Sequence, residues 1–489
     1  MGSFHRSLAR LQPPPAPAIL PGMLARLGDR VSAWFRATAP DPFVLAIILT
    51  VIAGLAAAWA QWSTTDDAGS TASLADAAWD TLGFWQAGIW NLVSFGMEMC
   101  LVLVTGHALA ASPIIARALR AVAGSARTPR QGVALTAACA MGAALINWGF
   151  GLIVGAILAR NVIASFRARG IGAPAGLIAG AGYLGLLVFH GGLSGSAPLA
   201  AASAELQSKV LGPDLGARIG AVSVRDTLFS PLNLVVTAGI VVLALVIMVA
   251  MAPKAGALAA ASPLPPGDAD APPADFDTGG RFPRWLERSP IVVWCIALPA
   301  LALAASALRT SGFAALNLGF INLLMLGLGL AAHGSARSYC AAVEEAARGC
   351  AGIIIQFPLY AGIMGMVQAS GLGAMLSESV VRAAGDSASL LGVMGVVSAS
   401  IVNLFVPSGG GQWAVQGPVF LEAALTTGMP PGRLIMAIAY GDQLTNMLQP
   451  FWALPLLAIT RVPAREIVGY TVIVMVAVFV WTCACMWFF

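Results

Sequence analysis

Long uncharged hydrophobic windows recur along the whole chain, separated by short polar or charged segments. A helix needs roughly 20 residues to cross the ~30 Å hydrocarbon core of a bilayer. The windows are continuously apolar rather than alternating, which favours transmembrane helices over the strands of a barrel. Uninterrupted windows predict spans near 42–61, 84–108, 228–252, 290–308, 312–333, 349–369 and 465–487.

Four further windows are interrupted by glycine, proline and polar residues. They are 131–159 with "NWGFG", 172–204 with "HGGLSGSAP", 387–421 with "VPSGGGQW" and 432–460 with "GDQLTNMLQP". Glycine and proline stop helices, so each window is expected to contain a break. Lipid cannot satisfy the backbone groups exposed by a break, so these breaks should face protein or a water-filled cavity.

The placement of arginine predicts how the chain crosses the membrane. The N-terminal arginines indicate a cytoplasmic N-terminus, and 62–83, with four aspartates and no basic residue, is expected outside. Arginines flank 131–159 on both sides, which predicts a re-entrant hairpin over 131–162 from the cytoplasm; a plain span is the alternative. Window 387–421 begins and ends outside, so a second hairpin, over 387–426, is expected from the opposite face.

These features predict an all-α polytopic membrane protein with about nine transmembrane helices and two re-entrant hairpins. Asn147 and Asn403 follow apolar pairs in the two hairpins, and a broken helix follows each hairpin, which indicates an inverted repeat of the kind found in secondary transporters. The expected domains are a cytoplasmic arm, 1–41, with an amphipathic helix; a first repeat, 42–252; a cytoplasmic linker, 253–289; and a second repeat, 290–489.

Composition agrees with a membrane protein and argues against an enzyme. Of 489 residues, 58% are hydrophobic and 10% charged, whereas soluble proteins carry about 25% charged residues. The seven cysteines show no metal-ligand spacing, and the four histidines are scattered, so neither a catalytic centre nor a metal site beyond a coupling Na⁺ is expected. We expect an integral membrane protein that binds lipid but no nucleic acid.

The broken helices predict a binding site for an anion. Half-helix N-termini attract carboxylates, and exposed carbonyls coordinate cations. Small residues that only pack helices together are the alternative for "PSGGGQ". The predicted substrate-binding residues are Asn147, Gly149, Gly151, Ser194, Gly195, Ser196, Asn403, Ser408, Gly409, Gly410, Gln412, Thr445 and Asn446.

Asp442 is the strongest candidate for ion coupling, because a carboxylate inside a span is costly unless it is paired or hydrated. Structural pairing with a distant arginine is the alternative. His190 is a candidate proton carrier, since imidazole titrates near neutral pH, or is held by a backbone carbonyl. Asn147 and Asn403 complete the predicted coupling set. Glu98 is a second intramembrane carboxylate, facing a cavity or reaching the interface.

Tryptophans beside the breaks are candidates for the wall of an apolar substrate pocket, with ordinary packing as the alternative. They are Trp148, Trp413 and Trp452.

The motifs "LVTGHALAASP", "NWGFGLIVGAILAR", "HGGLSGSAPL", "VPSGGGQWAVQGP" and "GDQLTNMLQPFWALP" resemble those of the AtoE-type short-chain fatty acid transporters, over about residues 40–488. This family is similar, more distantly, to the ion transporter superfamily. The resemblance implies symport of butyrate-like or acetoacetate-like monocarboxylates with H⁺ or Na⁺, an elevator motion and a homodimer. No other cofactor is implied.

Related carriers have Ser-Asn-Thr at the hairpin tips where this chain has "NWGFG" and "PSGGGQ". A carrier of other small organic anions, such as dicarboxylates, and an anion channel are the alternatives.

Overall fold

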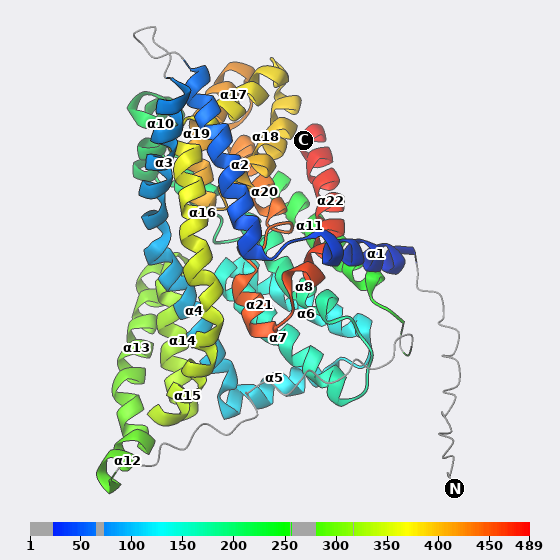
Figure 1. Cartoon of the computed structure of the whole chain (residues 1–489), viewed down its shortest axis with the longest axis vertical. Helices are drawn as coiled ribbons and strands as arrows, with labels where there is room; N and C mark the ends of the chain where they lie inside the picture. Colours follow the sequence, from blue (N-terminus) through cyan, green and yellow to red (C-terminus); the bar gives the residue numbers. More distant parts are fainter. Residues whose placement is uncertain (1–22, 65–72, 255, 257–279, 316) are drawn as a thin grey trace, which may run out of the picture.

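The computed structural model describes residues 23–64, 73–254, 256, 280–315 and 317–489, and every regular element in these ranges is helical (Figure 1). Eight helical stretches there are long and apolar enough to cross a membrane. The predicted all-helical membrane fold is therefore confirmed. The number of spans, the re-entrant course of the hairpins and the domain boundaries stay predictions.

One group of helices forms a long bundle on the left of Figure 1, and we call it the outer bundle. Its helices approach closely: a Cβ at Gly88 would lie 2.7 Å from the carbonyl oxygen of Ala361. The bundle consists of α2 (Pro42–Ser63), α3 (Leu74–Ile89), η1 (Trp90–Leu92), α4 (Val93–Ala111), α12 (Arg281–Arg288), α13 (Pro290–Ser311), η5 (Gly312–Ala315), α14 (Leu318–His333), α15 (Ala336–Ala347), η6 (Arg348–Cys350) and α16 (Ala351–Ala369).

A second group, which we call the inner body, contains all four interrupted windows. Much of it is deeply buried: every residue of the stretch from Gly432 to Met447 is buried except Arg433. The inner body consists of α6 (Pro129–Ile146), α7 (Trp148–Ala168), α8 (Ala175–Tyr183), η2 (Leu184–Leu187), η3 (Phe189–Gly191), α9 (Ser196–Ala202), α11 (Pro231–Met251), α18 (Ala388–Asn403), α19 (Gly409–Thr427), α20 (Pro431–Thr445), α21 (Leu454–Thr460) and α22 (Ala464–Phe488).

Three short helices and an amphipathic one lie around these two groups. The predicted helix at 23–39 is present as α1 (Met23–Thr38), which crosses α22 and α11 (Figure 1). Tyr470 donates a hydrogen bond to Asp29 there. The other three are α5 (Pro113–Ser125), α10 (Ala204–Ile219) and α17 (Leu372–Ala384).

Each predicted hairpin is a pair of helices separated by a short break, and a broken helix follows each pair. Asn147 separates α6 from α7, and residues 404–408 separate α18 from α19. Close packing of the first pair needs a glycine, because a Cβ at Gly151 would lie 2.4 Å from the Cβ of Ala144. Residues 192–195 precede α9, and 446–453 separate α20 from α21, as the glycine and proline positions predict.

Some helices extend beyond the windows. α3 begins at Leu74, inside the segment 62–83 expected as an external loop, because Ser73 caps it by accepting a hydrogen bond from the backbone N–H of Asp76. The charged segment 334–348 is largely the helix α15. The arm residues 1–22 and the linker residues 257–279 lie outside the described residues.

Candidate functional site

All four breaks contribute to one cavity of about 280 Å³, which we call the central cavity. The outer bundle closes one side, so the cavity lies between the two groups of helices. Its lining is Leu92, Phe95, Trp148, Leu186, Phe189, Ser196, Leu318, Pro407, Ser408, Gly409, Gly410, Asp442 and Trp452.

One wall of the central cavity is aromatic. The ring of Trp148 lies 5.1 Å from that of Trp452, in an edge-to-face arrangement. Phe95, from the outer bundle, lies 5.8 Å from Trp452 and 6.3 Å from Trp148. Such a wall offers apolar surface to a short alkyl chain.

Another part of the lining is the start of α19. Ser408 caps this helix, and its hydroxyl accepts a hydrogen bond from the backbone N–H of Gly411 at 3.3 Å. The first backbone N–H groups of a helix have no partner within it and favour an anion. Gly409 and Gly410 therefore bring both polar N–H groups and a helix dipole to the cavity wall.

Gly409 also lies against the broken helix of the first half. A Cβ there would lie 2.7 Å from Cε1 of His190 and 2.8 Å from the hydroxyl of Ser196. At Gly410 a Cβ would meet nothing within 4 Å. The close approach explains the need for glycine at the first of these two positions.

His190 and Asp442 form a buried pair beside the cavity. Nε2 of His190 lies 3.3 Å from Oδ1 of Asp442, and their side chains are 0% and 4% exposed. Nδ1 of His190 accepts a hydrogen bond from the backbone N–H of Ser196 at 3.2 Å. The proton of neutral His190 therefore lies on Nε2, the ring nitrogen nearer to the carboxylate, although Nε2 forms no hydrogen bond with any described residue.

Each of these two residues has a different partner from the alternative given for it in the sequence analysis. Asp442 is paired with histidine rather than with a distant arginine. The ring of His190 contacts a backbone N–H and a carboxylate rather than a backbone carbonyl.

Asn403 joins the second hairpin to the broken helix behind it. Its amide donates to the carbonyl of Asp442 at 2.7 Å, to the hydroxyl of Thr445 at 2.9 Å and to the side chain of Asn446 at 3.1 Å. Gln449 donates to the carbonyl of Asn403. Asn403 thus fixes the backbone that presents Asp442 to the cavity.

Several predicted residues lie near the central cavity without lining it. Asn147 caps α7 by accepting a hydrogen bond from the backbone N–H of Phe150, and Ser194 accepts one from that of Trp148. The buried side chain of Gln412 donates to the carbonyl of Ala399 and to Gln416, inside the second hairpin. The predicted residues outside the lining are Asn147, Gly149, Gly151, Ser194, Gly195, His190, Asn403, Gln412, Thr445 and Asn446. Whether any of them binds substrate or ion stays a prediction.

Two of the three candidate tryptophans, Trp148 and Trp452, line the cavity, while Trp413 is fully buried in the core. Glu98 is partly buried outside the central cavity, and its backbone carbonyl accepts a hydrogen bond from Asn322. Sequence reasoning did not select six further lining residues, whose apolar side chains look the same in a core as in a cavity wall. They are Leu92, Phe95, Leu186, Phe189, Leu318 and Pro407.

Comparisons with known proteins show which family the chain resembles. The model of the family described as "Short chain fatty acid transporter" matches residues 23–489. A protein of Escherichia coli (strain K12), provisionally named a short-chain fatty acid transporter, is 37% identical over 464 residues, covering 92% of this chain and 96% of its own length. A protein of Haemophilus influenzae (strain ATCC 51907 / DSM 11121 / KW20 / Rd) with the same provisional name is 36% identical over 458 residues, covering 92% and 96%.

Solved transporter structures are more distant. The YdaH transporter of Alcanivorax borkumensis superposes with a TM-score of 0.44 at 17% identity, covering 91% of this chain and 97% of its own. MtrF of Neisseria gonorrhoeae superposes with a TM-score of 0.35 at 13% identity, covering 93% and 96%. Both scores lie below 0.5, so neither structure bears on the function of this chain. The family match and the two relatives identify the chain as a member of the short-chain fatty acid transporter family.

Proposed function

We propose that this protein imports short-chain monocarboxylates of the butyrate or acetoacetate type together with H⁺ or Na⁺. The central cavity supports this proposal through its two unlike walls. The alkyl chain would lie against Trp148 and Trp452, and the carboxylate would lie at the start of α19 and the hydroxyl of Ser196.

The position of Asp442 is the observation that carries the coupling proposal. A substrate carboxylate in this cavity would lie near a second carboxylate that is almost fully buried. Two like charges 4 Å apart repel by about 4 kcal/mol at an effective dielectric constant of 20. A cation or proton that neutralises Asp442 removes this repulsion, so substrate and cation would favour each other's binding.

The hydrogen bonding of His190 favours Asp442 over His190 as the group that would take up a coupling proton. Nδ1 of His190 already accepts the N–H of Ser196, so a second proton on the ring would break that hydrogen bond. Protonation of Asp442 leaves the hydrogen bond between Ser196 and His190 in place. If H⁺ is the coupling ion, Asp442 is therefore the better acceptor; Na⁺ would instead share Asp442 with carbonyls of the broken helices.

The transport motion we propose is an elevator-type movement of the inner body against the outer bundle. The central cavity lies between the two groups, with Phe95 and Leu318 contributed by the outer bundle, and this arrangement supports the proposal. We further propose a homodimer in the bacterial inner membrane with a cytoplasmic N-terminus, on the basis of the family resemblance and the arginine distribution.

The Ser196 hydroxyl offers a direct test of where the substrate binds. Ser196→Ala should weaken butyrate binding to purified protein about two- to tenfold, the worth of 0.5–1.5 kcal/mol for one hydrogen bond. Ser125→Ala is the matched control, because the hydroxyl of this exposed serine contacts only the carbonyl of Val122 at the end of α5. If Ser196→Ala binds butyrate as tightly as Ser125→Ala and the wild type do, the substrate does not bind at this end of the cavity.

Counterflow in proteoliposomes separates the carrier from a channel. Unlabelled butyrate trapped inside should drive transient uptake of labelled butyrate with no ion gradient. A dicarboxylate carrier would instead exchange succinate in preference to butyrate, and a channel would show no counterflow.

A further inference from the structure

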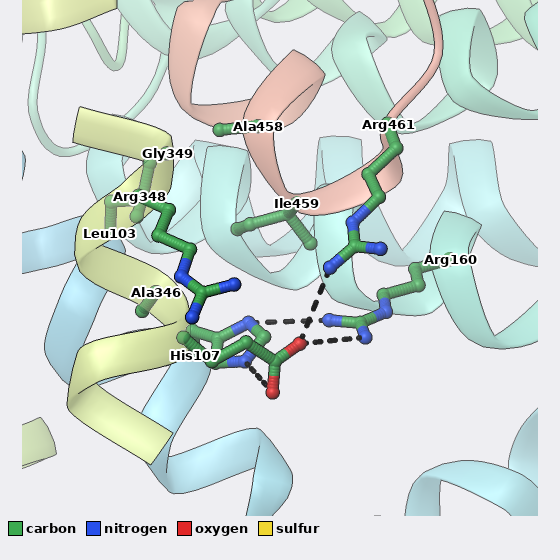
Figure 2. A pocket seen from close by; sticks show the side chains of 10 residues that line it. Leu103, His107, Arg160, Ala346, Arg348, Gly349, Ala458, Ile459 and Arg461 are labelled. Atoms are coloured by element: carbon green, nitrogen blue, oxygen red, sulfur yellow. Dashed lines mark hydrogen bonds and ion pairs between the residues drawn. The ribbon is translucent and has the colours of Figure 1, made fainter. Parts of the chain in front are cut away.

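A second pocket, of about 340 Å³, lies between the outer bundle and the inner body (Figure 2). Arg160 on α7 and Arg461 after α21 belong to the inner body, while His107 on α4 and Arg348 in η6 belong to the outer bundle. Figure 2 shows the three guanidinium groups directed into this space. We call it the arginine pocket.

The arginine pocket has an excess of positive charge. Its one carboxylate, Glu345, has one oxygen 3.5 Å from Arg160 and 3.6 Å from Arg461, and the other 3.6 Å from His107. These are long ion pairs, and the oxygen shared by the two arginines accepts no hydrogen bond among the described residues. Arg348 forms no ion pair with any residue in the described ranges. Three guanidinium groups thus face one carboxylate, which pairs with two of them and with His107.

The backbone of Arg461 adopts the left-handed conformation that ends α21, where its N–H donates to the carbonyl of Leu457. Arg461 has φ = 56°, and it is the one residue other than glycine with positive φ in the described part of the chain. A side chain in this left-handed region adds strain that the surrounding structure must hold. Glycine would avoid the strain, but only arginine also supplies a guanidinium group to the pocket.

The rest of the lining is small and apolar. Leu103, Ala346, Gly349, Ala458 and Ile459 surround the charged groups. The chemistry that fits this pocket is therefore a small anion with a short apolar part, and the carboxylate of Glu345 already occupies the anion position.

Two helices relate the arginine pocket to the central cavity. Trp148 and Arg160 both lie on α7, and Phe95 and His107 both lie on α4. Each pair is twelve residues apart, so at about 1.5 Å per residue each helix places the pocket roughly 18 Å from the cavity. The residues lie toward the face that the arginine distribution predicts as cytoplasmic.

We propose that the arginine pocket is a second binding site for short-chain carboxylates, at the cytoplasmic end of the path from the central cavity. The carboxylate binds to Arg348, Arg160 and Arg461 in competition with Glu345. This inference rests on the proposed function, because it takes the same substrate class.

Scintillation-proximity binding of tritiated butyrate to purified protein in phosphatidylcholine nanodiscs tests the proposal. Wild-type protein should show two classes of site. Arg348→Ala should weaken one class about tenfold or more, the effect of losing a hydrogen bond between charged groups. Glu345→Gln, which removes the competing charge and keeps the side-chain shape, should tighten the same class. Arg382→Ala, which breaks an exposed ion pair with Glu378 on α17, should change neither class.

Opposite effects of Arg348→Ala and Glu345→Gln would not arise from a purely structural ion-pair network. A single class of site in wild type, or two classes that neither substitution changes, would overturn the proposal. Loss of the Arg348-sensitive class when phosphatidylglycerol is added would show that a lipid phosphate occupies the pocket, and would also overturn it. If the proposed function fails instead, the result is different. The class of site that Arg348→Ala does not affect, which we assign to the central cavity, would then keep its affinity in Ser196→Ala.

Discussion

The two proposed anion sites, the central cavity and the arginine pocket, differ in the groups that would hold the anion. The central cavity has no arginine or lysine in its lining and presents helix N–H groups, a serine hydroxyl and aromatic rings. The arginine pocket uses three guanidinium groups that remain partly exposed, with side-chain exposures of 38% for Arg160 and 47% for Arg461. The difference follows the cost of burying a full charge, which partial charges on a rigid backbone avoid.

A consequence of this difference concerns release. An anion held by dipoles next to Asp442 would bind weakly once the coupling cation leaves, whereas an anion held by arginines needs no cation. In the proposed cycle the central cavity is therefore the gradient-dependent site and the arginine pocket the gradient-independent one.

Neutralising Asp442 should have the largest effect on the difference between the two sites. Asp442→Asn removes the charge that requires a cation, so butyrate accumulation driven by a proton or sodium gradient in proteoliposomes should be lost, while exchange at equal concentrations continues. Glu378→Gln is the control, since Glu378 pairs with Arg382 on an exposed helix face. Accumulation by Asp442→Asn at the wild-type level under both gradients would assign Asp442 a structural role.

The chain revealed its broken helices through local features. Glycine and proline interrupt a helix at the position where they occur in the sequence, so the breaks are visible in the sequence itself. Ser196, Ser408 and Asp442 lie in or beside these breaks and could therefore be selected without knowledge of the tertiary fold. The apolar half of the cavity could not, because Phe95 and Leu318 arrive from the outer bundle and carry no pattern that separates a cavity wall from a core.

The arginine pocket could not be predicted, for a different reason. In the sequence, Arg160 is one of the arginines that flank 131–159, and arginine at such a position indicates the cytoplasmic face rather than a binding site. Glu345 and Arg348 are three residues apart on one helical stretch, but His107, Arg160 and Arg461 come from other elements, and only the packing of α4 and α7 against α15 brings them to Glu345. Charge patterns along a chain do not predict such long-range pairing.

The two glycines at the start of α19 allow the central cavity to be altered by one methyl group at a time. Gly409→Ala places a methyl 2.7 Å from His190 and 2.8 Å from Ser196, and overpacking of this kind costs about 1–3 kcal/mol. We expect butyrate uptake at low concentration to fall about tenfold or more, with normal binding at the arginine pocket. Gly410→Ala is the matched control, because its methyl would meet open space and uptake should fall much less. Similar losses in both variants would show that the contact with the broken helix is unimportant.

The smallest expected effect concerns the aromatic wall, and it distinguishes the two sites by chain length. Trp148→Phe replaces a large ring with a smaller one and leaves room for a longer alkyl chain in the central cavity. Each buried methylene contributes about 0.8 kcal/mol, so affinity for pentanoate, which has one more methylene, should rise about fourfold relative to butyrate. Competition of C3 to C8 carboxylates against tritiated butyrate measures this change. The arginine pocket contains no tryptophan, so the preference of the Arg348-sensitive class should stay the same. A parallel shift in both classes would mean that they are one site, and an unchanged preference in both would mean that the alkyl chain does not lie against Trp148.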